Sequence, residues 1–144
     1  MRQDLAAVDR IAARDRYLAV VATTRADGTV QSSVVNAGVI PHPVSGARVV
    51  AFVSHGAAKN AHLRARPATT LTFRAGWQWI AVEGTAELIG PDDPALDPER
   101  LRVLLREIYQ AAGGEHEDWA EFDRAMRRER RTAVLVNPER IYSN

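Results

Sequence analysis

Apolar residues recur along this chain with two different periods, and each period predicts a different kind of element. Short runs rich in β-branched residues, such as YLAVVATT, are typical of buried strands. Most connections between these runs are too short for a crossover, so we expect the strands to pair antiparallel. The predicted strands cover residues 17–24, 29–40, 48–54, 69–75, 77–89 and 132–142.

Other segments place their apolar residues on one face of a helix. Leu101, Leu104, Leu105 and Ile108 follow the i, i+3, i+4, i+7 spacing of an amphipathic helix. The predicted helices cover residues 3–15, 57–66, 97–111 and 117–129. Six strands with a few helices in so small a chain favour a closed or half-closed β-barrel, because closure leaves no strand edge exposed.

The second predicted strand carries polar residues on both of its faces. Because side chains alternate across a strand, its faces are Gln31, Ser33 and Val35 on one side and Ser32, Val34 and Asn36 on the other. The preceding Asp27-Gly28 pair predicts a tight hairpin turn. Gly84, inside the fifth strand, indicates a bulge or the close approach of another backbone.

The composition is that of an ordinary globular protein of 144 residues, most simply one domain spanning residues 1–144. A net charge of +1 does not indicate nucleic acid or a membrane surface as a partner. Cysteine is absent, which excludes disulfides and thiolate chemistry. No signal peptide or apolar stretch of the ~20 residues that span a membrane is found, so we expect a cytoplasmic protein.

Lys59 is the only lysine in the chain, and it falls in the first turn of the predicted helix 57–66. A helix N-terminus has unpaired N–H groups and a partial positive charge, and an ammonium group adds to both. Gly56 leaves room for a ligand, and Ser54 and Asn60 can hydrogen-bond to it. This combination predicts an anion site, most naturally for a phosphate. The alternative is a solvated lysine at the start of a surface helix.

Two further groups of residues have both a structural and a functional interpretation. Trp77 and Trp79 have strand spacing, so they would share one face, either as core or dimer packing or as a wall for a flat ring. The basic run RAMRRERR at 124–131 is either a solvated helix face or a site that attracts an acidic cofactor tail. The four histidines lack metal-ligand spacing, so no metal site is expected.

Four segments together resemble a known superfamily in their order and spacing. They are TTRADGTVQSSVVNAGV, AFVSHGAAKNAHLRARPATTLTF, WQWIAVEGTAEL and AGGEHEDWAEFDRAMRRERRTAVLV. In this order they resemble the split β-barrel flavin and deazaflavin oxidoreductases, the superfamily of pyridoxamine 5′-phosphate oxidase. The resemblance covers nearly the whole chain. It is strongest to the branch that uses the deazaflavin coenzyme F420, which is typical of actinobacteria.

This resemblance implies a mainly β split barrel that forms a homodimer, with two cofactor clefts at the subunit interface. It implies that Lys59 holds the cofactor phosphate and that the second strand lies along the tricyclic ring. Trp77 and its neighbours would reach the cleft of the other subunit. The implied cofactor-binding residues are Gln31, Ser32, Ser33, Val34, Asn36, Ser54, Lys59, Asn60, Trp77, Gln78 and Trp79. Two positions depart from the family pattern: Ala57 stands where relatives often have arginine, and His62 where they often have asparagine.

The function expected from this resemblance is hydride transfer between reduced F420 and a small unsaturated organic substrate. No catalytic side chain is assigned, because the cofactor carries the redox chemistry and the protein supplies binding and orientation. Two alternatives stay open. One is an FMN-dependent oxidase or reductase, and the other is a non-catalytic protein that carries F420 or has lost the cofactor.

Overall fold

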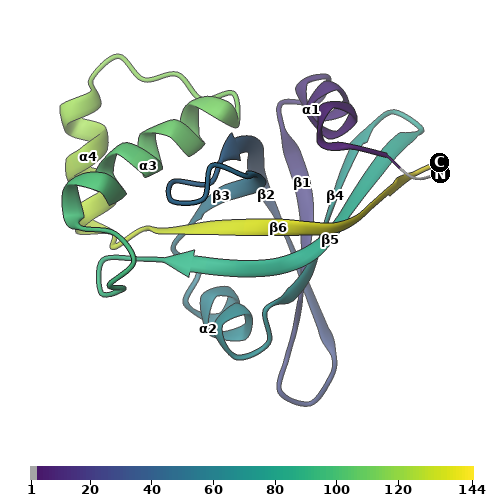
Figure 1. Ribbon diagram of the computed structural model, residues 1–144, viewed down its shortest axis with the longest axis horizontal. Coiled ribbons are helices and arrows are strands. Elements are labelled where there is room, and N and C mark those ends of the chain that lie inside the picture. Colours follow the sequence, from purple (N-terminus) through teal and green to yellow (C-terminus); the bar gives the residue numbers. More distant parts are fainter. Residues whose placement is uncertain (1–2) are drawn as a thin grey trace.

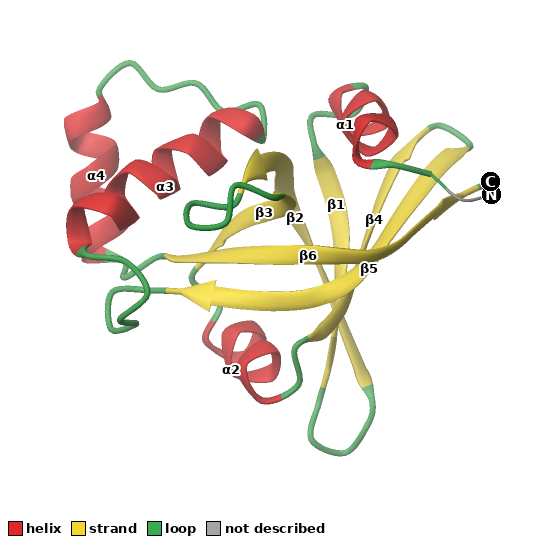
Figure 2. Cartoon of the chain, viewed as in Figure 1, coloured by secondary structure: helices red, strands yellow, loops and turns green. Residues whose placement is uncertain are grey.

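The computed structural model describes residues 3–144 as a closed antiparallel β-barrel with helices around it (Figures 1 and 2). The strands are β1 (Leu18–Thr24), β2 (Val30–Pro41), β3 (Arg48–Ser54), β4 (Ala68–Ala75), β5 (Gln78–Ile89) and β6 (Thr132–Ser143). The helices are α1 (Leu5–Ala13), α2 (Ala57–Ala65), α3 (Pro98–Ala111) and α4 (Trp119–Arg128). Strands neighbour one another in the order β1-β2-β3-β6-β5-β4, and β4 pairs with β1 to close the barrel. The predicted split-barrel fold is confirmed.

Every predicted element is present, and its ends differ from the prediction by no more than two residues. The hairpin at Asp27-Gly28 is confirmed, with Gly28 at φ 87°. Gly84 is confirmed as both a bulge and a close approach. The β5–β6 register shifts at this residue, and a Cβ there would collide with the carbonyl oxygen of Asn137.

Two hydrophobic clusters hold the fold together. The first fills the barrel and includes Val21, Phe52, Leu71, Phe73, Ile80 and Val134. The second joins the outer wall of the barrel to α3 and α4, and includes Val49, Ile89, Leu104, Leu105, Ile108 and Leu135. The apolar face predicted for residues 97–111 is the face that α3 buries. This packing fixes the α3–α4 hairpin beside β2 and β3 (Figure 1).

A charged group between α3 and α4 makes the hairpin one unit. Asp123 on α4 is 8% exposed and accepts hydrogen bonds from Arg102 and Arg106 on α3. The hydrogen bond from Arg106 is the main cause that lowers the pKa of Asp123 below its usual 3.8. The Arg106 guanidinium also lies 5.3 Å from the ring centroid of Trp119. Both helices are therefore tied to each other as well as to the barrel.

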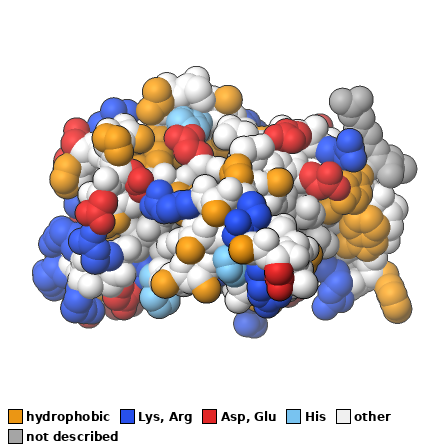
Figure 3. Space-filling view, turned by 90° about the horizontal axis from the view of Figure 1, so that it is seen from below, with side chains coloured by type: hydrophobic (Ala, Val, Ile, Leu, Met, Phe, Trp, Pro, Cys, Tyr) orange, Lys and Arg blue, Asp and Glu red, His pale blue; other side chains and the backbone are white. Residues whose placement is uncertain are grey.

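The surface carries a basic region and an apolar one. Figure 3 shows Lys and Arg side chains gathered at the α4 end of the molecule, where Arg124, Arg127 and Arg128 are exposed. On the outer face of the β1–β2 pair, Val20 lies directly opposite Val34, and these side chains are 45% and 64% exposed. None of the helices within residues 3–144 has the length and apolar character needed to cross a membrane.

Candidate functional site

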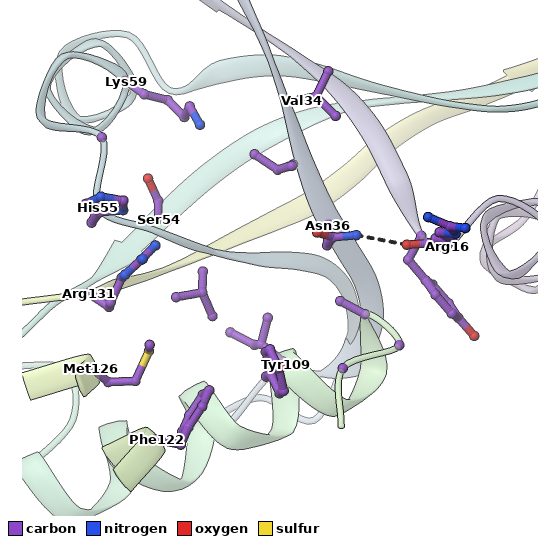
Figure 4. A pocket seen from close by; sticks show the side chains of 18 residues that line it. Arg16, Val34, Asn36, Ser54, His55, Lys59, Tyr109, Phe122, Met126 and Arg131 are labelled. Atoms are coloured by element: carbon purple, nitrogen blue, oxygen red, sulfur yellow. Dashed lines mark hydrogen bonds between the residues drawn. The ribbon is translucent and has the colours of Figure 1, made fainter. Parts of the chain in front are cut away.

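A cleft of about 750 Å³ lies between the β2–β3 wall of the barrel and the α3–α4 hairpin (Figure 4). Its volume falls within the roughly 300–1,000 Å³ of typical small-molecule and cofactor sites. The second hydrophobic cluster creates the cleft, because it holds the hairpin against the barrel and leaves an open space beside it. Polar side chains line its two ends, and apolar side chains line the middle.

Lys59 projects into one end of this cleft from the first turn of α2 (Figure 4). Partial burial lowers the pKa of its amine below the ordinary 10.5. Its Nζ lies 5.8 Å from the ring centroid of Phe52 and pairs with no carboxylate of residues 3–144. A partly desolvated cation without a counter-charge is energetically costly. The amine therefore has the properties of a group that binds an anion.

The start of α2 differs from the starts of the other three helices in the described chain. Helices α1, α3 and α4 each begin at an aspartate whose side chain accepts a backbone N–H: Asp4, Asp97 and Asp118. Helix α2 begins after Gly56, and no side chain caps it. The free N–H groups and the partial positive charge of this end therefore face the same region as the Lys59 amine.

Ser54 and Asn60 complete this end of the cleft. Ser54 is the last residue of β3 and lines the cleft, while its hydroxyl donates a 2.8 Å hydrogen bond to Oδ1 of Asn60. Asn60 itself does not line the cleft. It contributes by fixing the orientation of Ser54 and by joining the end of β3 to α2.

The middle of the cleft is apolar. Val34 and Val53 contribute from the barrel, and Tyr109, Phe122 and Met126 from the helices. The Tyr109 and Phe122 rings are 4.9 Å apart between centroids. Side chains of this kind exclude water and suit a flat, largely apolar group.

The end of the cleft opposite Lys59 is a strained backbone corner. Arg16 and Tyr17 lie there with φ values of 58° and 59°, in the left-handed region that non-glycine residues rarely adopt. Asn36 lines this end and donates a 2.9 Å hydrogen bond from Nδ2 to the carbonyl oxygen of Arg16 (Figure 4). Gly113, at φ 84°, packs its backbone against the Tyr17 ring.

The structure brings together some of the predicted site residues and separates others. Val34, Asn36, Ser54 and Lys59 line the cleft, and Asn60 supports it through Ser54. Six predicted residues do not line the cleft of their own chain: Gln31, Ser32, Ser33, Trp77, Gln78 and Trp79. The first three belong to the half of β2 that pairs with Val21, Ala22 and Thr23. The roles of all these predicted residues in cofactor binding stay predictions.

The segment around Trp77 differs from its prediction. Because Gly76 adopts φ 63° and Asn144 Nδ2 donates to the Trp77 carbonyl, Trp77 lies in the turn before β5 and is 94% exposed. The predicted strand beginning at residue 77 is therefore wrong by one residue, and the two tryptophans do not lie on one strand face. Gln78 accepts a 2.6 Å hydrogen bond from Arg14, and Trp79 packs edge-on against Tyr142.

Several residues that line the cleft were not predicted: Arg16, Tyr17, His55, Tyr109, Phe122, Met126 and Arg131. The sequence marks Arg131 only as part of the basic run 124–131, which is interpreted as a solvated helix face or as a site that attracts an acidic cofactor tail. It marks Phe122 and Met126 only as the apolar face of a helix. Their convergence requires the α3–α4 hairpin to fold back onto the barrel, which no local pattern specifies.

A six-stranded antiparallel barrel with a lateral cleft is the architecture of the split-barrel proteins. The chain matches the pyridoxamine 5′-phosphate oxidase family over residues 7–144, and it belongs to that family. The family binds flavin-type cofactors and consists generally of oxidoreductases.

Three solved structures share this fold at low sequence identity. An F420 reductase is 17% identical, with a TM-score of 0.59 over 88% of this chain and 90% of its own. A pyridoxamine 5′-phosphate oxidase-related, FMN-binding protein from Nostoc punctiforme is 12% identical, with a TM-score of 0.60 over 96% and 82%. A heme binding protein from Mycobacterium smegmatis is 15% identical, with a TM-score of 0.61 over 100% and 55%. Three ligand classes on one fold mean that the cofactor has to be argued from the cleft itself.

Proposed function

We propose that this protein is an F420-dependent oxidoreductase that transfers a hydride between the reduced coenzyme and a small unsaturated organic substrate. One observation carries the proposal: the partly buried Lys59 amine, without a counter-charge, stands at one end of an apolar cleft. An anionic group at that end and a flat ring in the middle would satisfy both features, and a deazaflavin with its phosphate supplies both.

Each part of the cleft then has a defined task. Lys59 and the uncapped start of α2 would bind the phosphate. Val34 and Asn36, on the same face of β2, would orient the ring. Tyr109, together with its neighbours on α4, would cover the ring and exclude water. When bound, the reduced coenzyme would supply a hydride to an electrophilic carbon of the substrate, and a proton from water would complete the two-electron reduction at the adjacent carbon.

The basic surface on α4 favours F420 over FMN. FMN ends at its phosphate, whereas F420 continues from a phosphodiester into an acidic oligoglutamate tail. Arg131 lines the Lys59 end of the cleft, and the exposed Arg127 and Arg128 precede it on α4. A tail that leaves the cleft at this end would pass a surface of opposite charge, which would contribute most at low salt.

The test is a binding titration of the purified protein with F420, FMN and haem, followed by turnover with a panel of unsaturated substrates. We expect binding of F420, preference for F420 over FMN, and oxidation of reduced F420 by at least one substrate. Tighter binding of FMN would favour the alternative of an FMN-dependent enzyme. Binding of F420 without turnover would favour the carrier. A Soret band on haem addition with no flavin binding would contradict the proposal.

We also propose that the protein is a homodimer whose partner covers the outer face of β1 and β2. The exposed Val20 and Val34 form an apolar pair on this face, and Val34 also lines the cleft, so a partner there would lie beside the cofactor. The partner's exposed tryptophan at the turn before β5 could then approach the cleft. The cytoplasmic location expected from the sequence stays a prediction.

Light scattering coupled to size exclusion tests the dimer. Val20→Glu should shift the protein toward the monomer, because a charge at the centre of an apolar interface is strongly unfavourable. Val103→Glu is the matched control, since Val103 is similarly exposed but lies on α3. An unchanged mass for Val20→Glu, or a monomeric wild type, would contradict this interface.

A further inference from the structure

Arg131 reaches the Lys59 end of the cleft from a part of the chain far from α2. Helix α4 ends at Arg128, and Arg130 adopts a left-handed φ of 49°. The N–H of Arg131 bonds to the carbonyl of Met126, and β6 starts at the next residue. Because Thr132 pairs with Ser54, Arg131 arrives beside the end of β3 and the start of α2 (Figure 4).

The side chain of Arg131 is partly buried, and only one of its three nitrogens has a hydrogen-bond partner among residues 3–144. It is 24% exposed, and its Nε donates a 2.8 Å hydrogen bond to Glu129 Oε2. This bond is the main cause that lowers the pKa of Glu129 below its ordinary 4.5. The two terminal nitrogens of Arg131 bond to no residue of 3–144. Glu129 thus holds the guanidinium by one side and leaves its terminal fork free.

A phosphate at this end needs more than one positive group. A phosphate carries between about one and two negative charges at neutral pH, as a diester or a monoester. Ala57 and Ala58 bring no charge to the start of α2, so Lys59 is the single cation that this helix contributes there. The free fork of Arg131 has the geometry that binds two oxygens of one phosphate group.

We propose that Arg131 is a second phosphate-binding residue of the cleft: its two terminal guanidinium nitrogens bind the phosphate group that the Lys59 amine also binds. This inference rests on the proposed function, because the phosphate belongs to the flavin-type coenzyme. It assigns the site to two elements, α2 and the α4–β6 junction, that only the folded barrel brings together.

The test compares Arg131→Gln with the wild type on two ligand pairs that differ in phosphate. FMN is paired with riboflavin, and F420 with its phosphate-free deazaflavin fragment, and the dissociation constants are measured by fluorescence. We expect Arg131→Gln to weaken the phosphate-bearing ligands by roughly tenfold or more and to leave the phosphate-free ligands unchanged. Arg10→Gln removes the same charge from the exposed surface of α1, away from both the cleft lining and the basic run on α4, and should change neither pair.

Other outcomes separate the inference from the function on which it rests. If the wild type binds the phosphate-bearing ligands and Arg131→Gln keeps their advantage over the phosphate-free ones, the inference fails and the proposed function stands. If the wild type binds none of the four ligands, the proposed function fails. A titration with inorganic phosphate, followed by ³¹P NMR, then tests Arg131 directly. Binding lost in Arg131→Gln supports the assignment, and binding equal in both proteins or absent from the wild type overturns it.

A loss of binding in Arg131→Gln is informative only if this variant is folded, so two further measurements accompany the titration. Thermal unfolding should show that Arg131→Gln keeps a cooperative transition. Arg131→Lys keeps the charge but removes the planar fork, and its affinity for FMN should fall between those of the wild type and Arg131→Gln. An affinity of Arg131→Lys below that of Arg131→Gln would contradict a charge-based role.

Discussion

The two ends of the cleft differ in whether side-chain charge or backbone conformation is their unusual feature. At the Lys59 end the cleft is lined by the cations Lys59 and Arg131, whose hydrogen-bonding groups are incompletely paired within residues 3–144, and a single left-handed residue, Arg130, precedes Arg131. At the Arg16 end the side chains matter less, and the backbone is unusual, because two consecutive residues adopt a left-handed conformation. The Lys59 end therefore has cations that lack a full set of partners, and the Arg16 end has backbone strain.

Hydrogen bonds within the chain hold the strained end of the cleft in place. Each left-handed non-glycine residue costs on the order of 1–3 kcal/mol. Three bonds hold the corner in place: Tyr17 N–H to the Ala12 carbonyl, Ala37 N–H to the Tyr17 carbonyl, and Asn36 Nδ2 to the Arg16 carbonyl. The comparison teaches that a strained backbone held by hydrogen bonds defines the shape of this cleft, while incompletely paired cations define what the cleft binds.

The largest expected effect comes from removing the charge at the Lys59 end. Lys59→Ala should weaken binding of the phosphate-bearing coenzyme by about 10- to 100-fold, since a hydrogen bond to a charged group contributes roughly 1.5–3 kcal/mol. A titration followed by absorbance or fluorescence measures this loss. Arg124→Ala is the control, because Arg124 belongs to the exposed basic run and does not line the cleft. Equal losses in the two variants would refute the phosphate site.

A change at the strained end should act mainly on stability. Gly113→Ala places a methyl group 2.8 Å from the Tyr17 ring at φ 84°, so the ring or the loop has to move. Gly46→Ala is matched in backbone strain, at φ 77°, but its methyl group meets nothing within 4 Å. Urea unfolding should show that Gly113→Ala is less stable than Gly46→Ala by about 1–3 kcal/mol, the usual cost of overpacking. Equal stabilities would mean that Gly113 does not support the corner.

The smallest expected effect is the pH dependence of binding, which hardly changes affinity at neutral pH but tests the role of the Lys59 charge directly. Burial lowers the pKa of Lys59 from 10.5, so its ammonium loses its proton at a lower pH than an exposed lysine does. As the pH rises, the affinity of the wild type for the phosphate should therefore begin to fall at a pH lower than 10.5. Lys59→Arg stays charged throughout this range, and its affinity should show no such fall. Parallel profiles for the two proteins would assign the titration to the ligand or to another residue.

Features that depend on residues close together in the sequence were predicted better than features that depend on distant residues. The strand 48–54 and the helix 97–111 were predicted closely, because alternation, helical spacing and capping residues act within a few positions. Lys59 was predicted as an anion site for the same reason, since its helix start and its small neighbours are adjacent in sequence. Trp77 was misplaced by one residue: it belongs to the turn at Gly76, where its carbonyl accepts a hydrogen bond from the distant Asn144.

By itself, the sequence determined the order of strands and helices, the position of the lone lysine at a helix start, and the resemblance that gave the family. Only the tertiary structure decided that Arg131, Tyr109 and Arg16 face the same space, because barrel closure and the packing of α3 on the outer wall bring them there. The physical reason is that a local pattern records which face of an element is apolar, whereas a cleft is the space left where faces from distant segments meet.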